Sequence, residues 1–208
     1  MSGAEYRIPC AAQPEERVLQ AAPKAVLEYW YPVFDTPDYR PHTYGQLLRV
    51  PWGLCVRMVC AEHAPRAVQR MPNSPVCTDS CMEFFLEPQP GTGCFLNFEM
   101  NAQGVLLMGL NEQGVFRCLD AALQAACMPW AEETADGWEM RLCIPDSLVR
   151  RFFADWKPEQ AHAMRGNFYK CGDETPRPHY GSWSEVTRRP VDFHCPECFG
   201  TLLLKQDE

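Results

Sequence analysis

The chain has 208 residues, which suits one domain with enough volume for a hydrophobic core. Its formal net charge of −8, without a cluster of Lys and Arg, argues against a nucleic-acid partner. No apolar run is long enough to span a membrane, and the N-terminus lacks the basic and apolar stretches of a secretory signal. We therefore expect a cytoplasmic protein without membrane or nucleic-acid partners, whose oligomeric state stays open.

Twelve cysteines raise the question of disulfides or metal binding. Without a visible signal peptide they are expected to be reduced thiols, most of them buried as small apolar side chains. Cys195 and Cys198 follow His194 with the spacing of zinc ligands, and with Cys77 and Cys81 they form an alternative, a zinc site. Three residues instead of two separate Cys77 from Cys81, which disfavours zinc, and no βαβ pattern supports a redox role.

The N-terminal part is predicted to begin with an irregular or partly strand-like lead-in, residues 1–24, within the same domain. Apolar residues then predict a strand over residues 25–33, closed by Pro32 and Pro37. A hairpin is expected next, turning at Val50-Pro51-Trp52-Gly53, followed by a long surface loop rich in Pro, His, Arg and Asn. The hairpin arms are residues 43–48 and 53–60, and the loop is 61–78.

A second hairpin is predicted over residues 79–101, because both of its arms alternate apolar and polar side chains with period two. The separator, residues 89–93, is rich in Gly and Pro and short enough to return the chain antiparallel. With this pairing, Glu83, Asn97 and Glu99 share one face of the sheet. A face that combines carboxylates, an amide and aromatic rings can bind a polyol, a cation or nothing, and the alternation alone does not decide among these.

The rest of the chain predicts more short strands and one short helix. The helix should follow Pro145, where Asp146 or Ser147 can cap it, and its apolar stripe would cover one end of a sheet. Many short strands with Pro/Gly turns predict an all-β fold, an antiparallel β-sandwich, as a single domain over residues 25–208. The remaining strands are expected at 104–110, 115–119, 138–144, 165–171, 180–186 and 201–205.

Four segments together resemble the family 9 carbohydrate-binding modules, and more closely the single-domain family 9-like proteins. A weaker likeness over residues 43–67 extends the resemblance over most of the chain. Each segment is moderately specific alone, but their order and spacing make a chance match improbable. The segments are Asp79-Ser-Cys-Met-Glu-Phe-Phe-Leu-Glu-Pro88, Asn97-Phe-Glu-Met-Asn101, Arg165 to Trp183, and Phe193-His-Cys-Pro-Glu-Cys-Phe-Gly-Thr-Leu-Leu203 with Leu204.

The resemblance implies a sandwich related to the DOMON-type sugar- and haem-binding domains, with a sugar site on a sheet face. In that family two tryptophans clamp the sugar while charged and amide side chains hold its hydroxyls. The likeness places Glu83 on a sugar-binding glutamate and Asn97 on a position held there by an arginine. It places Lys170 near an amide position and Trp183 on one clamp tryptophan, while His179 is expected at the rim.

The chain departs from this pattern in its aromatic residues. The second clamp tryptophan should precede the Asp79-Ser80 pair, yet residues 68–82 contain no aromatic side chain. The family also implies structural calcium, so calcium is a candidate cofactor, although no dense Asp/Asn loop is present. Haem would need a Met/His axial pair, and nothing in the sequence brings Met100 or Met108 to a histidine.

Three functions stay open, and non-catalytic carbohydrate binding is favoured. It would use Glu83, Asn97, Glu99 and Lys170, with Trp183 as an aromatic platform. A glycoside-acting enzyme is the first alternative, because retaining glycosidases hold two carboxyl groups about 5–5.5 Å apart and cross-strand Glu83 and Glu99 could reach that spacing. The second is an interaction domain whose sugar site has decayed, since half of the clamp is missing.

Overall fold

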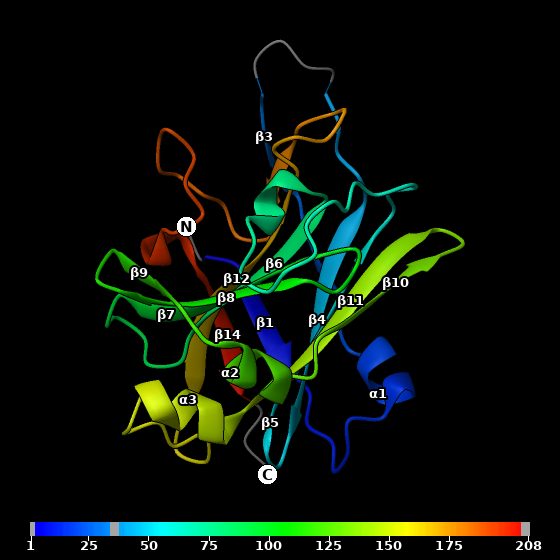
Figure 1. Cartoon of the computed structure of the whole chain (residues 1–208). Coiled ribbons are helices and arrows are strands. Elements are labelled where there is room, and N and C mark those ends of the chain that lie inside the picture. Colours follow the sequence, from blue (N-terminus) through cyan, green and yellow to red (C-terminus); the bar gives the residue numbers. More distant parts are fainter. Residues whose placement is uncertain (1–2, 34–37, 205–208) are drawn as a thin grey trace.

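The computed structural model describes residues 3–33 and 38–204, and most of its strands belong to one large sheet (Figure 1). The strands of this larger sheet are β1 (Glu5–Ile8), β3 (Tyr29–Tyr31), β6 (Cys81–Glu87), β7 (Cys94–Asn101), β8 (Leu106–Glu112), β9 (Val115–Cys118), β12 (Ala163–Cys171), β13 (Tyr180–Ser182) and β14 (Gly200–Leu204). They run in the order β1-β14-β12-β6-β7-β8-β9, and β13 joins β12 to β3. The β6–β7 hairpin therefore lies in the middle of the sheet.

The second sheet has five strands and lies beside the first (Figure 1). Its strands are β2 (Ala25–Val26), β4 (Thr43–Val50), β5 (Gly53–Cys60), β10 (Trp130–Thr134) and β11 (Gly137–Pro145). They run in the order β10-β11-β5-β4-β2, all antiparallel. The expected β4–β5 hairpin is thus confirmed.

The core lies between the two sheets. Because side chains alternate with period two along the strands, each sheet contributes one apolar face to this core. Met82 and Phe84 of β6 point inward, as do Val56 and Met58 of β5, and all four are fully buried in one apolar cluster. This arrangement confirms the predicted β-sandwich, since each sheet hides one apolar face against the other. The opposite face of β6 carries Glu83 and is left for other contacts.

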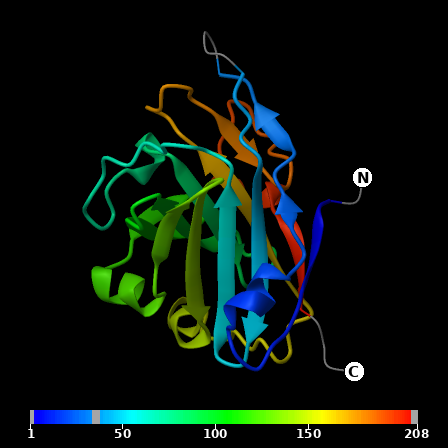
Figure 2. The same cartoon turned by 90° about the vertical axis from the view of Figure 1, so that its right-hand side faces the viewer.

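The expectation of a single helix is wrong, because the described residues contain three: α1 (Glu16–Gln20), α2 (Ala121–Ala126) and α3 (Asp146–Phe152). Figure 2 shows α1 lying over β4 and β5, where Leu19 packs against the outer side of the smaller sheet. Helices α1 and α2 have five and six residues, too few for a 3.6-residue pattern to be legible in the sequence. Strand β10 was also missed, because its side chains are mostly exposed and polar.

Two local predictions are corrected as well. The N-cap of α3 is Pro145, and Asp146 accepts hydrogen bonds from Arg49 Nη1 and Nη2 at 2.7 and 2.5 Å instead of capping the helix. Strands β1 and β14 pair in parallel, so the sandwich is not antiparallel throughout. The parallel pairing brings the lead-in, which was expected to be irregular or partly strand-like, into the larger sheet through β1.

Reduced thiols were expected throughout, but Cys55 of β5 and Cys143 of β11 form a disulfide. The two residues are direct cross-strand partners, so the pairing of β5 with β11 itself brings the sulfur atoms together. The other described cysteines form no disulfide. No helix among residues 3–33 and 38–204 is long and apolar enough to cross a membrane. Pro37 and Lys205, which were expected to close a strand and end another, lie outside the described residues.

Candidate functional site

A pocket of about 650 Å³ opens on the outer face of the larger sheet. Its floor comes from β6, β7 and the end of β12, and the segment 189–194 forms one wall. Residues from β3, from the loop before β6 and from β13 complete it. The lining residues are Tyr31, Pro32, Cys77, Glu83, Glu99, Cys171, Asp173, Tyr180, Arg189, Pro190, Val191, Asp192, Phe193 and His194.

Two carboxyl groups form the polar part of the floor. Glu83 of β6 and Glu99 of β7 are direct cross-strand partners, and both side chains are buried, at 3% and 6% exposure. Asn97 Nδ2 donates a hydrogen bond of 2.7 Å to Glu99 Oε1, and Cys171 Sγ donates one of 2.9 Å to Glu83 Oε1. The strand register thus fixes both carboxyl groups next to each other at the pocket floor.

Burial changes the protonation of these groups. It raises the pKa of Glu99 to about 7, and burial together with the neighbouring Glu99 raises the pKa of Glu83 well above its usual range. Burial also raises the pKa of Asp173 at the pocket wall. A protonated carboxyl group both donates and accepts hydrogen bonds. The carboxyl groups of this floor can therefore donate hydrogen bonds to the hydroxyl groups of a ligand and accept hydrogen bonds from them.

Aromatic rings form the apolar wall of the pocket. The ring of Phe193 stacks on that of Tyr169, with centroids 4.2 Å apart and planes 14° from parallel. Tyr169 Oη donates a hydrogen bond of 3.1 Å to the carbonyl of Phe193, while the hydroxyl of Tyr31 lies 2.7 Å from Ser182 Oγ. Tyr180 meets the edge of the Phe193 ring. These contacts hold the wall in place before any ligand arrives.

The structure brings together three of the six residues predicted for the site. Glu83, Asn97 and Glu99 share one face of the sheet, as the alternation predicts. Asn97 is fully buried and does not line the pocket, so it positions Glu99 instead of facing a ligand. Its Oδ1 has no hydrogen-bond partner within the described residues.

Lys170 was expected on this face and His179 at its rim, but neither side chain lines the pocket. Lys170 follows Tyr169 on β12 and points to the opposite side of the sheet, where its Nζ lies 3.1 Å from Glu62 Oε2 and 2.7 Å from His179 Nε2. Burial and the Lys170 ammonium group lower the pKa of His179 to about 4, so the imidazole is neutral at pH 7. It donates through Nδ1 to the carbonyl of Arg177 at 2.7 Å and accepts from Lys170.

Trp183 also lies away from the pocket. Its ring meets those of Tyr6 and Phe168 edge-on, at centroid distances of 6.3 and 6.0 Å, and packs against the core between the sheets. Trp183, the predicted platform, therefore does not line the pocket, whereas Phe193, Tyr31 and Tyr180 do. Phe193 lies inside one of the segments that carry the family resemblance, which is the signal that could have identified it.

The alternative zinc site, which the sequence disfavoured, is not formed by the described residues, because Cys195 and Cys198 do not group with Cys77 and Cys81. Cys195 and Cys198 lie 2.6 Å apart at the 3-10 helix η2 (Pro196–Cys198), in contact with each other. Within the described residues, the group of three potential metal ligands is instead Cys81, Glu83 and Cys171. Two thiols and one carboxyl group do not form the oxygen cage that calcium requires.

Comparison with known proteins places this geometry in context. Residues 30–204 match a family described as carbohydrate-binding family 9, whereas no curated protein matches the chain. A proposed carbohydrate-binding protein from Bacteroides uniformis ATCC 8492 has a similar structure, with a TM-score of 0.82, 27% identity and coverage of 98% of this chain and 100% of that one.

A family 9 carbohydrate-binding module from Caldicellulosiruptor kristjanssonii is similar in fold in two structures. The complex with cellotriose gives a TM-score of 0.65 and covers 99% of this chain and 95% of that one. The complex with glucose gives 0.67, with 99% and 97% covered. Both are 12% identical to this chain, a level that shows a common fold alone.

Proposed function

Because the chain belongs to carbohydrate-binding family 9, we propose that the pocket above Glu83 and Glu99 binds a mono- or oligosaccharide without cleaving it. The observation that carries this proposal is the meeting of an aromatic wall and a carboxyl floor in one pocket. The apolar face of a sugar ring can lie against Phe193, while its hydroxyl groups exchange hydrogen bonds with Glu99, Glu83 and Asp173. A volume of about 650 Å³ falls in the usual range of small-molecule sites.

The site differs from the clamp that the family resemblance implies. Phe193 replaces Trp183 as the platform, with Tyr31 and Tyr180 as further aromatic walls of the same pocket. Glucose and cello-oligosaccharides are the first ligands to test, because the module from Caldicellulosiruptor kristjanssonii was solved with glucose and with cellotriose. The cytoplasmic location remains a proposal.

The first experiment is a thermal-unfolding screen of the full chain against glucose, cellotriose and a panel of other mono- and oligosaccharides. A ligand at 100 times its dissociation constant should stabilise the fold by about 2.7 kcal/mol. The sugar is then recovered and analysed. An intact sugar supports the binding function, cleavage products would instead support a glycosidase using Glu83 and Glu99, and no stabilisation by any sugar would support a decayed site.

Phe193→Leu should weaken binding of the sugar that passes the screen. The substitution keeps an apolar side chain but removes the ring, whose stacking contributes about 1–3 kcal/mol by analogy with nucleic-acid bases. The dissociation constant, measured by calorimetry, should rise roughly 5- to 150-fold.

Phe199→Leu is the matched control, because Phe199 is buried in the same outer apolar cluster but does not line the pocket. It should leave the dissociation constant near that of the wild type. Trp183→Phe should do the same. If Trp183→Phe weakens binding and Phe193→Leu does not, the sugar binds elsewhere and the proposal is wrong.

A further inference from the structure

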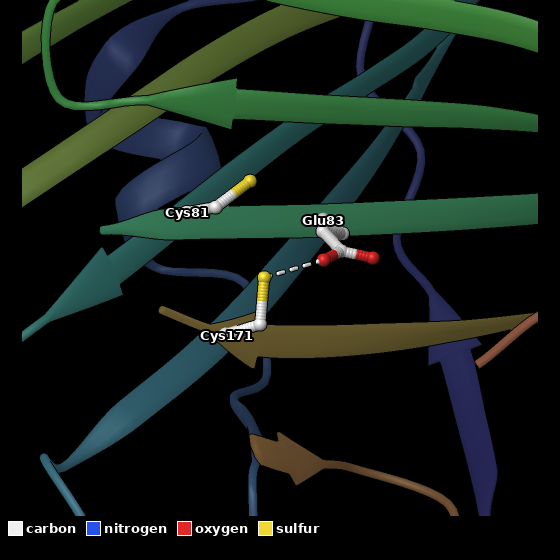
Figure 3. A group of neighbouring side chains, drawn as sticks. All are labelled: Cys81, Glu83 and Cys171. Carbon is white, nitrogen blue, oxygen red and sulfur yellow. Dashed lines mark hydrogen bonds between the residues drawn. The ribbon is translucent and has the colours of Figure 1, made fainter. Parts of the chain in front are cut away.

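The pocket floor contains a group of potential metal ligands that sugar binding does not require. Cys81 and Cys171 are direct cross-strand partners on β6 and β12, and Glu83 lies two residues beyond Cys81 on the same face. Figure 3 shows these side chains and the contact between the Cys171 thiol and the Glu83 carboxyl group. The ligand atoms of all three residues lie within 4.8 Å of one another, and all three side chains are buried.

Among the described residues that line the pocket, Arg189 carries a permanent positive charge, but its Nη1 donates to the backbone carbonyls of Val186 and Arg188 at 2.7 and 2.8 Å instead of pairing with these acidic groups. The nearest lysine along β12, Lys170, points to the other side of the sheet and pairs there with Glu62. Glu99 adds a further carboxyl group beside Glu83. A bound cation would pair with the carboxylate and thiolate charges that appear when these groups lose their protons, and buried charges in proteins are commonly paired or coordinated to metals.

The donor set selects the kind of cation. Thiolates suit soft or borderline metals, and the carboxylate oxygen excludes a purely thiolate site such as that of an iron–sulfur cluster. In tetrahedral zinc sites the metal lies about 2.3 Å from sulfur and about 2.0–2.2 Å from oxygen, so neighbouring ligand atoms are roughly 3.3–3.8 Å apart. The three ligand atoms, at present within 4.8 Å of one another, would need to approach by at most about 1 Å to reach this spacing.

We propose that Cys81, Glu83 and Cys171 form a zinc site at the floor of the pocket. Zinc displaces the protons of the two thiols and of the Glu83 carboxyl group to solvent and binds two thiolates and one carboxylate. Glu83 and Cys171 line the pocket, so the fourth coordination position faces its interior and takes a water molecule. The site is distinct from the proposed sugar contacts at Phe193 and shares only Glu83 with them.

The test is a titration of the reduced full chain with Co²⁺ in the absence of sugar, followed by competition with Zn²⁺. Wild type should bind one Co²⁺ per chain, with near-ultraviolet absorption from cobalt–thiolate charge transfer. Cys81→Ser and Cys171→Ser should each reduce this absorption and weaken binding at least about tenfold. Cys195→Ser is the control, because it changes a buried thiol in the separate pair at η2, and it should behave as wild type.

Absence of thiolate absorption in the wild type would overturn the proposal. So would absorption that survives Cys81→Ser and Cys171→Ser but disappears in Cys195→Ser. X-ray absorption of the zinc-loaded wild type needs no variant: two sulfur neighbours at about 2.3 Å support the site, and a shell of nitrogen and oxygen alone contradicts it. No sugar is present in this titration, so a failure to bind metal would leave the proposed sugar binding untouched. A failure to bind sugar in the thermal-unfolding screen would likewise leave the proposed zinc site untouched.

Discussion

Lys170→Met is expected to destabilise the fold by about 3–5 kcal/mol, because it leaves the buried carboxylate of Glu62 without its cation. The ammonium group of Lys170 is fully buried and lies 3.1 Å from Glu62 Oε2. Burial alone would lower the pKa of Lys170, but Glu62, together with Cys60 and Cys171, outweighs burial and raises it. Lys170 in turn lowers the pKa of Glu62 against the effect of burial. Both groups are therefore charged at pH 7.

Urea unfolding of wild type and variant at pH 7 measures this loss directly. Arg7→Met is the matched control, because Arg7 pairs with Glu5 at 3.7 Å on the exposed surface and should cost no more than about 1 kcal/mol. Adding Glu62→Gln to Lys170→Met should recover part of the stability, since no unpaired charge then remains. A loss below about 1 kcal/mol for Lys170→Met alone would show that the buried pair is not charged.

Glu99→Gln is expected to stabilise the unliganded fold by about 3 kcal/mol at pH 8 and to have little effect at pH 4. Burial raises the pKa of Glu99 from 4.5 to about 7. Between these values the folded state keeps a proton that the unfolded state has lost, so the stability of the wild type falls as pH rises through this window. Glutamine does not titrate, and the variant therefore avoids the loss.

Denaturant unfolding of both proteins from pH 4 to pH 8 checks this prediction. Glu133→Gln is the control, because Glu133 is exposed on β10 and its substitution should change stability by less than about 0.5 kcal/mol at any pH. A difference between Glu99→Gln and wild type that does not change with pH would contradict the raised pKa. The expected gain in stability of Glu99→Gln would also indicate that the native carboxyl group of Glu99 lowers the stability of the fold, as residues at many functional sites do.

Much of the architecture could be predicted from local patterns. The β4–β5 and β6–β7 hairpins and helix α3 were all predicted, because alternation and turn residues are strong signals over these lengths. The pairing of Glu83 with Glu99 follows directly from the same alternation. Helices α1 and α2 and the exposed strand β10 were missed. They are short elements that depend on contacts with the rest of the fold, and their sequences show little hydrophobic periodicity.

The candidate site was predicted less well, for a geometrical reason. Alternation along β12 places Phe168 and Lys170 on the inner side and Tyr169 and Cys171 on the outer side, so Lys170 cannot share a face with the pocket. The resemblance to the family suggested Lys170 through its position in a motif and overlooked this alternation. Phe193 lies in a segment between strands, and no periodic pattern can tell where such a segment folds over a sheet.

The disulfide shows another limit of sequence. Cys55 and Cys143 are 88 residues apart, and only the pairing of β5 with β11 makes them neighbours. The same holds for Cys81 and Cys171, which β6 and β12 bring face to face. Cysteine spacing along the chain pointed instead to Cys195 and Cys198, whose proximity is local. Contacts between distant strands depend on the complete sheet order, which short motifs do not encode.

A crystal structure of the full chain with glucose or cellotriose is the most direct test of the central claim, that the pocket on the outer face of the larger sheet binds a sugar. The account predicts one sugar ring lying against Phe193, with hydroxyl groups hydrogen-bonded to Glu99 or Glu83. A sugar seated against Trp183 on the other side of the sheet, with the pocket at Phe193 left without one, would contradict it.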